Sequence, residues 1–263
     1  MRRPANLVAV FLESRRAKGC TDGTLAAYRV HLEQYHSHTD RINSRSVSSY
    51  LADLRTRAKP GYAWTQARTL RTYVRWLYSM GYLRKPVQVE MPRNPFQMGR
   101  VLSPDEVRRI LSVADPREQA IIMLLLDTGL RRSEACSLTW ADLEDHTIRL
   151  RAGKGGHGRI VFIGDYSSAA LEAIRSDGPI LGLKPEGLRT MLNRLSRRSG
   201  VPQVTCHAFR RSFATSMIRA GVPLLHVQRM MGHRTLAMIL RYAQVTGDDL
   251  AESHKRAGVV DRL

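Results

Sequence analysis

The strongest constraint on the fold is a run of six consecutive apolar residues, from Ile121 to Leu126. A helix that is apolar on every side must lie inside a domain, so we predict a buried helix over residues 117–128. Gly129 suits the left-handed backbone position that commonly follows a helix. Arg131 and Glu134 come directly afterwards. Because charges at the end of a buried helix are costly without partners, we expect Glu134 to brace Arg131.

The charge of the chain is strongly positive. Its 42 Lys and Arg against 23 Asp and Glu give a formal net charge of +19. Such an excess is typical of proteins that bind a polyanion, although a basic ribosomal or membrane-surface protein would share it. The 263 residues, 43% of them hydrophobic, suffice for two modest domains.

The sequence favours a cytoplasmic protein without a membrane anchor. No apolar run reaches the roughly 18 residues that a membrane span needs, and the first residues lack the apolar centre of a signal peptide. The cysteines are odd in number and widely spaced, which argues against a zinc site or a disulfide framework; they are Cys20, Cys136 and Cys206. We interpret them as reduced structural thiols. Cys206 beside His207 suggests a nucleophile, but a free cysteine is more often a small buried residue.

The first 83 residues predict four amphipathic helices joined by short connections, which make a compact all-α domain. The first helix is expected over residues 6–17, and the second begins with Asp22 as its cap. The third is expected over residues 44–57. The fourth carries the apolar stripe Ala67, Leu70, Val74 and Leu77.

The fourth helix also carries a basic stripe, because Arg68, Arg71 and Arg75 fall at helical spacing. Residues 1–92 hold sixteen Lys and Arg against six Asp and Glu. A solvated face is the ordinary fate of such charges. The excess of positive charge favours contact with DNA instead.

Residues 84–102 contain three prolines and a glycine without periodicity, which predicts an extended linker. Ser103 and Glu106 then form a capping box around Pro104, so a helix begins there. We therefore divide the chain into a helical domain at 1–83, a linker at 84–102 and a second domain at 103–263.

Two segments of the second domain alternate as strands do, at residues 147–151 and 159–163. A glycine-rich turn with Lys154 joins them. It lacks the spacing of a nucleotide-binding phosphate loop, and a surface hairpin with an idle lysine is the plain alternative. Two helices are expected within residues 166–199, where Arg189 and Arg194 either face DNA phosphates or only add solubility. The fold class is therefore mainly α, α+β, with a small antiparallel sheet.

The stretch that ends at Tyr242 carries the most reactive set of side chains. His207 and Arg210 lie three residues apart on one helical face, His233 follows Gly232 at a turn, and Tyr242 lies nine residues further on. Arginine fits phosphate oxygens with two parallel N–H donors. Imidazole donates hydrogen bonds or protons near neutral pH, and tyrosine can attack phosphorus and hold it covalently. Together these groups suit a phosphodiester.

These motifs resemble the signature of the tyrosine recombinase (phage integrase) family. The matching pieces are Thr-Gly-Leu-Arg-x-x-Glu, Gly-Lys-Gly, His-x-x-Arg, Gly-His and a tyrosine, in this order. Each piece is short, but their ordered combination is specific. The resemblance implies that the catalytic residues are Arg131, Lys154, His207, Arg210, His233 and Tyr242, supported by Glu134. Many members of the family carry a second basic residue, often lysine, where His157 stands here, which leaves open which side chain adjusts the turn.

The resemblance also implies a site-specific recombinase for DNA recombination or integration. Residues 1–83 would form a SAM-like core-binding domain on DNA. Tyr242 would attack the phosphodiester and form a 3′-phosphotyrosyl link, and two such exchanges would pass through a Holliday junction. The expected partners are double-stranded DNA target sites and three further copies, in a homo-tetramer that exchanges C-terminal tails in a closed ring. No membrane contact, cofactor or metal is implied.

Two other functions fit part of the sequence. A type IB topoisomerase uses similar residues to relax supercoils without exchanging strands between duplexes. A non-catalytic regulator could use residues 207–242 as a helix-turn-helix. Such a regulator would have no reason to keep the six candidate catalytic residues together, which favours the recombinase.

Overall fold

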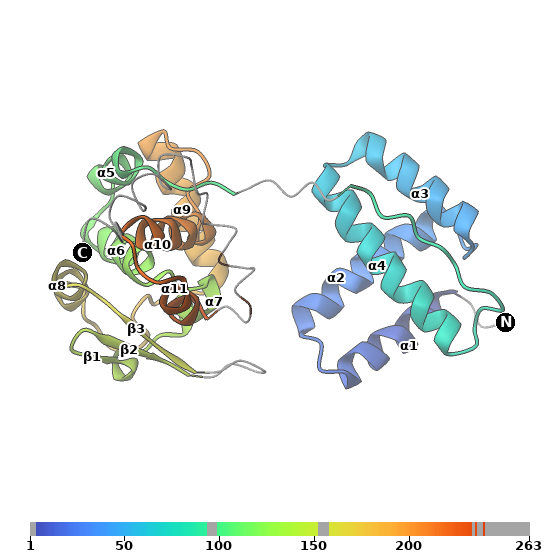
Figure 1. Cartoon of the computed structure of the whole chain (residues 1–263), viewed down its shortest axis with the longest axis horizontal. Helices are drawn as coiled ribbons and strands as arrows, with labels where there is room; N and C mark the ends of the chain where they lie inside the picture. Colours follow the sequence, from blue (N-terminus) through green and yellow to red (C-terminus); the bar gives the residue numbers. More distant parts are fainter. Residues whose placement is uncertain (1–3, 94–98, 152–157, 233–234, 236–238, 240–263) are drawn as a thin grey trace, which may run out of the picture. The chain divides into compact units, whose positions relative to one another are not determined.

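The computed structural model describes residues 4–93, 99–151, 158–232, 235 and 239 of the chain (Figure 1). It divides into two compact units, Met1–Gln97 and Met98–Leu263. Most of the described residues are helical, and one small antiparallel sheet lies in the second unit. The predicted fold class is confirmed. Among the described residues no helix is long and apolar enough to cross a membrane.

The described residues of the first unit form four helices, as predicted. They are α1 Pro4–Ala17, α2 Asp22–His38, α3 Ser44–Arg57 and α4 Pro60–Ser79. Their core is rich in aromatic rings, with Phe11, Tyr35, Tyr50 and Tyr73 fully buried. The predicted cap of α2 was wrong by one residue, because the Thr21 hydroxyl accepts the hydrogen bond from the Thr24 N–H and Asp22 is already helical.

The segment that follows α4 packs on the first unit for part of its length. Val87, Val89 and Met91 lie against the core of the four helices, and the Gln88 N–H donates to the Ser44 hydroxyl at 3.1 Å. This segment has neither helix nor strand. Part of the predicted linker therefore lies on the first unit.

The second unit places a buried helix at its centre. Helix α6, Pro116–Thr128, packs against α8 and α10, and no residue from Glu118 to Leu130 is exposed. Gly129 follows in a left-handed conformation with φ +59°. The buried helix and its glycine end are confirmed. The remaining helices are α5 Pro104–Ser112, α7 Arg132–Ser137, α8 Asp165–Ala173, α9 Pro185–Ser199, α10 Cys206–Arg219 and α11 Leu224–Met231.

The sheet has the order β1-β2-β3 and is antiparallel throughout. Strands β2, Thr147–Leu150, and β3, Arg159–Phe162, form the predicted hairpin, with Ile148 opposite Val161. Two short elements were not predicted: α7, and the strand β1, Leu143–Glu144, which follows a single turn of 3-10 helix at Trp140–Asp142. The capping box of α5 was predicted correctly, since Ser103 and Glu106 exchange side-chain and backbone hydrogen bonds.

Candidate active site

The carbonyl end of α11 is the point where the candidate site is assembled. The last carbonyls of a helix have no partner within it and carry partial negative charge. Three arginines from three other elements donate to three consecutive carbonyls at this end. The pairs are Arg159 Nε with Met230 O at 2.8 Å, Arg210 Nη2 with Met231 O, and Arg131 Nη2 with Gly232 O at 2.8 Å.

Glu134 on α7 joins two of these arginines. Both terminal nitrogens of Arg159 donate to the two carboxylate oxygens at 2.8 Å each. Arg131 donates from Nη1 at 2.7 Å and from its backbone N–H at 2.8 Å. The side chains of Arg159, Glu134 and Arg131 are 12%, 21% and 42% exposed. The three charges therefore form a row that runs from the interior to the surface.

Glu134 is held in its charged form. Burial alone would raise the pKa of this carboxyl, but hydrogen bonds and charges from Arg159 and Arg131 outweigh it and lower the pKa to about 2. Two guanidinium charges against one carboxylate leave a single net positive charge on the row. Of the two guanidinium groups, that of Arg131 is the more exposed.

Two glycines allow these groups to come close together. Gly129 and Gly232 both have φ +59°, a conformation that other residues rarely adopt. A Cβ on Gly129 would lie 2.5 Å from Cδ1 of Phe213, and one on Gly232 would lie 2.9 Å from Nη1 of Arg159. Both positions thus require glycine for the backbone conformation and for space.

Helix α10 carries His207 and Arg210 on its first turns. The Thr205 hydroxyl caps the helix by accepting from the Ala208 N–H at 3.1 Å. Arg210 is only 3% exposed, and its Nη1 donates to Gly129 O at 2.5 Å, so it connects the ends of α6 and α11. His207 is exposed. Although the residue is exposed overall, burial of part of its side chain and the nearby charges of Arg211 and Arg210 lower the pKa of His207, which favours the neutral imidazole.

Comparison with known proteins identifies the family. Residues 100–248 match the model of the Phage integrase family. The chain belongs to this family. Tyrosine recombinase XerA of Thermococcus onnurineus (strain NA1) is 30% identical, over 94% of this chain and 93% of the relative. Tyrosine recombinase XerD of Listeria monocytogenes serovar 1/2a is 27% identical, over 91% of this chain and 93% of the relative. The chain is therefore a tyrosine site-specific recombinase, an enzyme that transfers DNA strands.

Solved structures share its fold. A lambda integrase (75–356) dimer bound to a COC′ core site has a TM-score of 0.80 at 16% identity, over 92% of this chain and 96% of that one. The Tn1549 transposon integrase in complex with a circular intermediate DNA has a TM-score of 0.77 at 19% identity, over 97% and 100%. At these identities the likeness is one of fold.

The structure places four of the seven residues expected at the recombinase site. Arg131, Glu134 and Arg210 meet around the end of α11, and His207 lies one turn before Arg210 on α10. The other three lie outside the described residues; they are Lys154, His233 and Tyr242. Gly232, the last described residue before His233, receives the hydrogen bond from Arg131.

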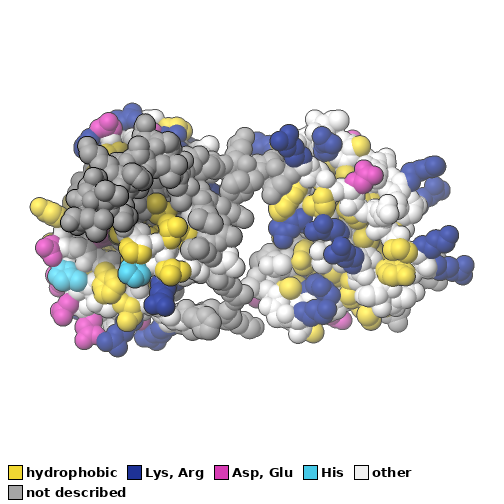
Figure 2. Space-filling view, viewed as in Figure 1, with side chains coloured by type: hydrophobic (Ala, Val, Ile, Leu, Met, Phe, Trp, Pro, Cys, Tyr) yellow, Lys and Arg dark blue, Asp and Glu magenta, His cyan; other side chains and the backbone are white. Residues whose placement is uncertain are grey.

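The arginines predicted to bind DNA differ in their surroundings. On α4, Arg68 and Arg75 are exposed and Arg71 is half-buried, and the Arg68 guanidinium lies 4.8 Å from the centre of the Trp64 ring. Figure 2 shows many Lys and Arg and few acidic side chains on the visible face of the first unit. On α9, Arg189 is paired with Glu186 at 2.8 Å, while Arg194 is exposed.

Arg159 is the residue of this site that the sequence did not reveal. It begins β3, and its sequence neighbourhood resembles that of Arg149 on the adjacent strand and of Arg151 directly after it. Its importance comes from its contacts with α7 and α11, which are distant in sequence.

The Cys206 thiol, whose pKa burial raises to about 11, is unsuited to act as a nucleophile.

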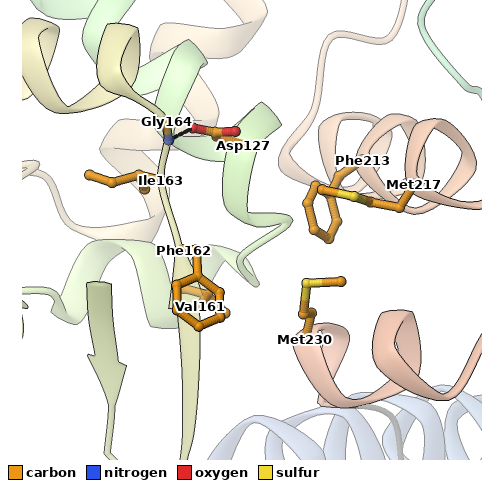
Figure 3. A pocket seen from close by; sticks show the side chains of 8 residues that line it. All are labelled: Asp127, Val161, Phe162, Ile163, Gly164, Phe213, Met217 and Met230. Atoms are coloured by element: carbon orange, nitrogen blue, oxygen red, sulfur yellow. Dashed lines mark hydrogen bonds between the residues drawn. The ribbon is translucent and has the colours of Figure 1, made fainter. Parts of the chain in front are cut away.

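Two hollows flank these groups. The first is apolar, lies between the end of β3 and helices α10 and α11, and is drawn in Figure 3 with Phe162, Phe213 and Met230 around it. At its edge the Asp127 carboxylate accepts the Gly164 N–H at 2.6 Å. The second hollow is basic, and its lining includes Arg100, Asn193, Arg197, His207 and Arg211.

Proposed function

We propose that this recombinase cleaves DNA with Tyr242 and holds the broken strand as a 3′-phosphotyrosyl intermediate. Two rounds of cleavage and rejoining would then pass through a Holliday junction. The observation that carries this proposal is the meeting of Arg131, Arg210 and Glu134 at the end of α11. The chain runs from that end directly into His233, the next motif residue. Basic groups therefore gather where the nucleophile's segment begins.

Arg131 and Arg210 would neutralise the non-bridging oxygens of the phosphate. Phosphoryl transfer depends mainly on positioning and on stabilising the charge of these oxygens. Each terminal guanidinium nitrogen carries two hydrogens, so Arg131 can keep its hydrogen bonds to Glu134 and Gly232 and still donate to the phosphate. Arg131 would meet the phosphate from the more exposed side of the site, and the buried Arg210 would meet it from the interior.

Proton transfer would involve His207, His233 and Lys154. The pKa of a free tyrosine is about 10, so nearby cations must favour the ionised phenol. His207, neutral because its pKa is lowered, can accept the phenol proton or a hydrogen bond. His233 would donate to the phosphate, and Lys154 would protonate the departing 5′ oxygen.

The DNA would lie along the basic hollow beside His207. Arg100, Arg197 and Arg211 offer cations to backbone phosphates there. The first unit would bind the duplex as a core-binding domain through Arg68, Arg71 and Arg75. Four copies would assemble on two duplexes as a homo-tetramer and exchange their C-terminal tails. We place this activity in the cytoplasm, on nucleoid DNA.

The test of this proposal is a covalent complex that depends on Tyr242. The target site is first mapped on host DNA by protection and by cleavage. A nicked duplex carrying that site then traps the cleaved strand, and the wild-type chain is expected to form an adduct that denaturing gels resolve. Tyr242→Phe is expected to bind the duplex and form none. An adduct with Tyr242→Phe, or wild-type relaxation of plasmids that lack the site, would contradict the proposal.

A further inference from the structure

Arg159 joins three elements of the site without reaching its exposed side. Its two terminal nitrogens donate hydrogen bonds to both carboxylate oxygens of Glu134, and its Nε donates to Met230 O. Its side chain is 12% exposed. We propose that Arg159 is a positioning residue for strand cleavage, which offsets the negative charge of Glu134 and, through Glu134, fixes the orientation of Arg131. This inference rests on the proposed function, in which Arg131 neutralises the scissile phosphate.

The charge argument begins with the pair that would remain without Arg159. Arg131 and Glu134 alone form an ion pair with no net charge, in contact at 2.7 Å. Such a pair offers little to a phosphate, because the carboxylate repels the same oxygens that the guanidinium attracts. Arg159 adds a second positive charge on the inner side of Glu134. The row then keeps one positive charge, and the exposed guanidinium of Arg131 presents it.

The geometric argument concerns the orientation of Glu134. A carboxylate with one arginine on its side could rotate toward that arginine or toward solvent. Here the two-pronged contact from Arg159 fixes the carboxylate plane, and the remaining contacts come from Arg131. A lysine in place of Arg159 would keep the charge but could not make two parallel contacts and reach Met230 O.

The third argument is the position of Gly232. Its carbonyl accepts from Arg131, and its Cα lies so close to Arg159 that a Cβ would be 2.9 Å from Nη1. Arg159 and Arg131 therefore hold the two sides of the residue that precedes His233. Any shift of Arg159 is transmitted to the start of the segment that leads to Tyr242. A largely buried residue can thus affect the rate of cleavage.

The experiment measures single-turnover formation of the covalent complex on the nicked duplex. The full-length variants are Arg159→Ala, Arg159→Lys and the double variant Arg159→Ala with Glu134→Gln. The matched control is Arg149→Ala, which removes an exposed arginine paired with Glu144 on the neighbouring strand. Each variant is also assayed for DNA affinity at fixed salt and for thermal unfolding. A second duplex carries a methylphosphonate at the scissile position, which has one fewer negative charge to neutralise.

We expect Arg159→Ala to slow cleavage about 10²-fold with DNA affinity within about threefold, a decrease similar to that caused by removing one charge-stabilising donor. The cleavage rate of Arg159→Lys should lie between those of Arg159→Ala and the wild type. The double variant should recover at least about fivefold over Arg159→Ala, because removing the carboxylate removes the negative charge that offsets Arg131. On the methylphosphonate duplex the Arg159→Ala defect should shrink to within about tenfold. Arg149→Ala should remain within about twofold of wild type on both duplexes.

A purely structural role gives a different pattern. Arg159→Ala would then slow cleavage of both duplexes by the same factor, and the double variant would be no faster than Arg159→Ala. This result would overturn the proposal. Cleavage by Arg159→Ala at the wild-type rate would overturn it as well. Failure of the proposed function is seen separately, because the wild-type chain would then form no adduct through Tyr242.

Discussion

Glu134 shows how one carboxylate can contribute both to stability and to the candidate chemistry. It is partly buried, yet it accepts hydrogen bonds from Arg159 and from both the side chain and the backbone of Arg131. Removing one partner of a partly buried carboxylate destabilises the fold, because its charge is then no longer fully compensated, whereas the complete set of partners compensates it. The residues of this site are therefore interdependent, and removing a single member changes the net charge of the group that remains.

The lowered pKa of Glu134 predicts acid sensitivity. A carboxyl whose pKa falls from 4.5 to about 2 on folding stabilises the fold above pH 4.5 and loses that contribution as the pH falls toward 2. The shift corresponds to an upper limit of roughly 3.5 kcal/mol, at about 1.4 kcal/mol per pH unit. Glu134→Gln should therefore destabilise the protein at pH 7, and by much less near pH 3. Urea unfolding at both pH values measures the difference.

The control for this prediction is Glu144→Gln. Glu144 also pairs with an arginine, but both partners are about two-thirds exposed. Exposed pairs contribute little, typically below about 1 kcal/mol. A Glu144→Gln variant as acid-dependent as Glu134→Gln would contradict the assignment of the effect to the buried row.

His207 is predicted to titrate below its ordinary pKa of 6.5 in the free protein. Burial is the main cause, and the positive charges of Arg211 and Arg210 add to it. Arg211→Gln removes one of these charges and should move the pKa upward. NMR titration of the imidazole ring, assigned with His207→Gln, measures both values. A wild-type pKa above 6.5 would argue against a neutral imidazole that accepts the phenol proton.

The elements are joined at glycines that cannot be exchanged freely. Gly129 ends α6 and Gly200 ends α9, both with a left-handed backbone. At Gly129 a Cβ would meet Phe213 at 2.5 Å, whereas at Gly200 nothing lies within 4 Å. Gly200→Ala should therefore lower the free energy of unfolding only by the backbone strain, about 1 kcal/mol. Gly129→Ala should lower the free energy of unfolding by at least about 2 kcal/mol more, because a packed core resists an added methyl group.

Thermal and chemical unfolding of the two variants test this prediction. Gly129→Ala is also expected to slow cleavage, since the Gly129 carbonyl accepts from Arg210. Gly200→Ala should cleave normally. Equal destabilisation by the two substitutions would show that the space around Gly129 adjusts easily, and would remove the packing argument.

Local signals explain which elements could be predicted from the sequence. The buried helix α6, its Gly129 end and the capping box of Ser103 depend on residues within a few positions of one another. The same holds for His207 and Arg210, which share one helix. The N-cap of α2 was misplaced because Thr21 and Asp22 are both suitable caps, and only the backbone angles distinguish them.

Contacts between distant segments explain what the sequence did not reveal. The role of Arg159 depends on contacts of β3 with α7 and α11. In the sequence, Arg159 lies 25 positions from Glu134 and 71 positions from Met230. No spacing rule distinguishes it from other arginines on the same hairpin. Strand β1 was missed because it has only two residues and exists through its pairing with β2.

At the scale of the whole molecule, positive charge is spread over both units. The formal net charge of +19 is far more than the site itself uses. Binding to DNA releases counterions from the phosphates, so affinity falls as salt rises in proportion to the number of phosphates contacted. Base contacts specify the site, whereas these phosphate contacts position the protein. The distribution of charge should therefore set how strongly salt affects binding.

The basic stripe of α4 provides the test at this scale. Arg68 and Arg75 are exposed on one helical face, and we expect each to contact a phosphate. The double variant Arg68→Ala with Arg75→Ala should weaken binding to all DNA sequences alike. It should also reduce the slope of log affinity against log salt by about 2, or about 1 for each phosphate that is no longer neutralised. Arg57→Ala is the control, because Arg57 lies in the same unit but is paired with Asp53 at 2.8 Å. An unchanged slope in the double variant would assign the stripe to solvent, and DNA contact would then have to come from other basic residues.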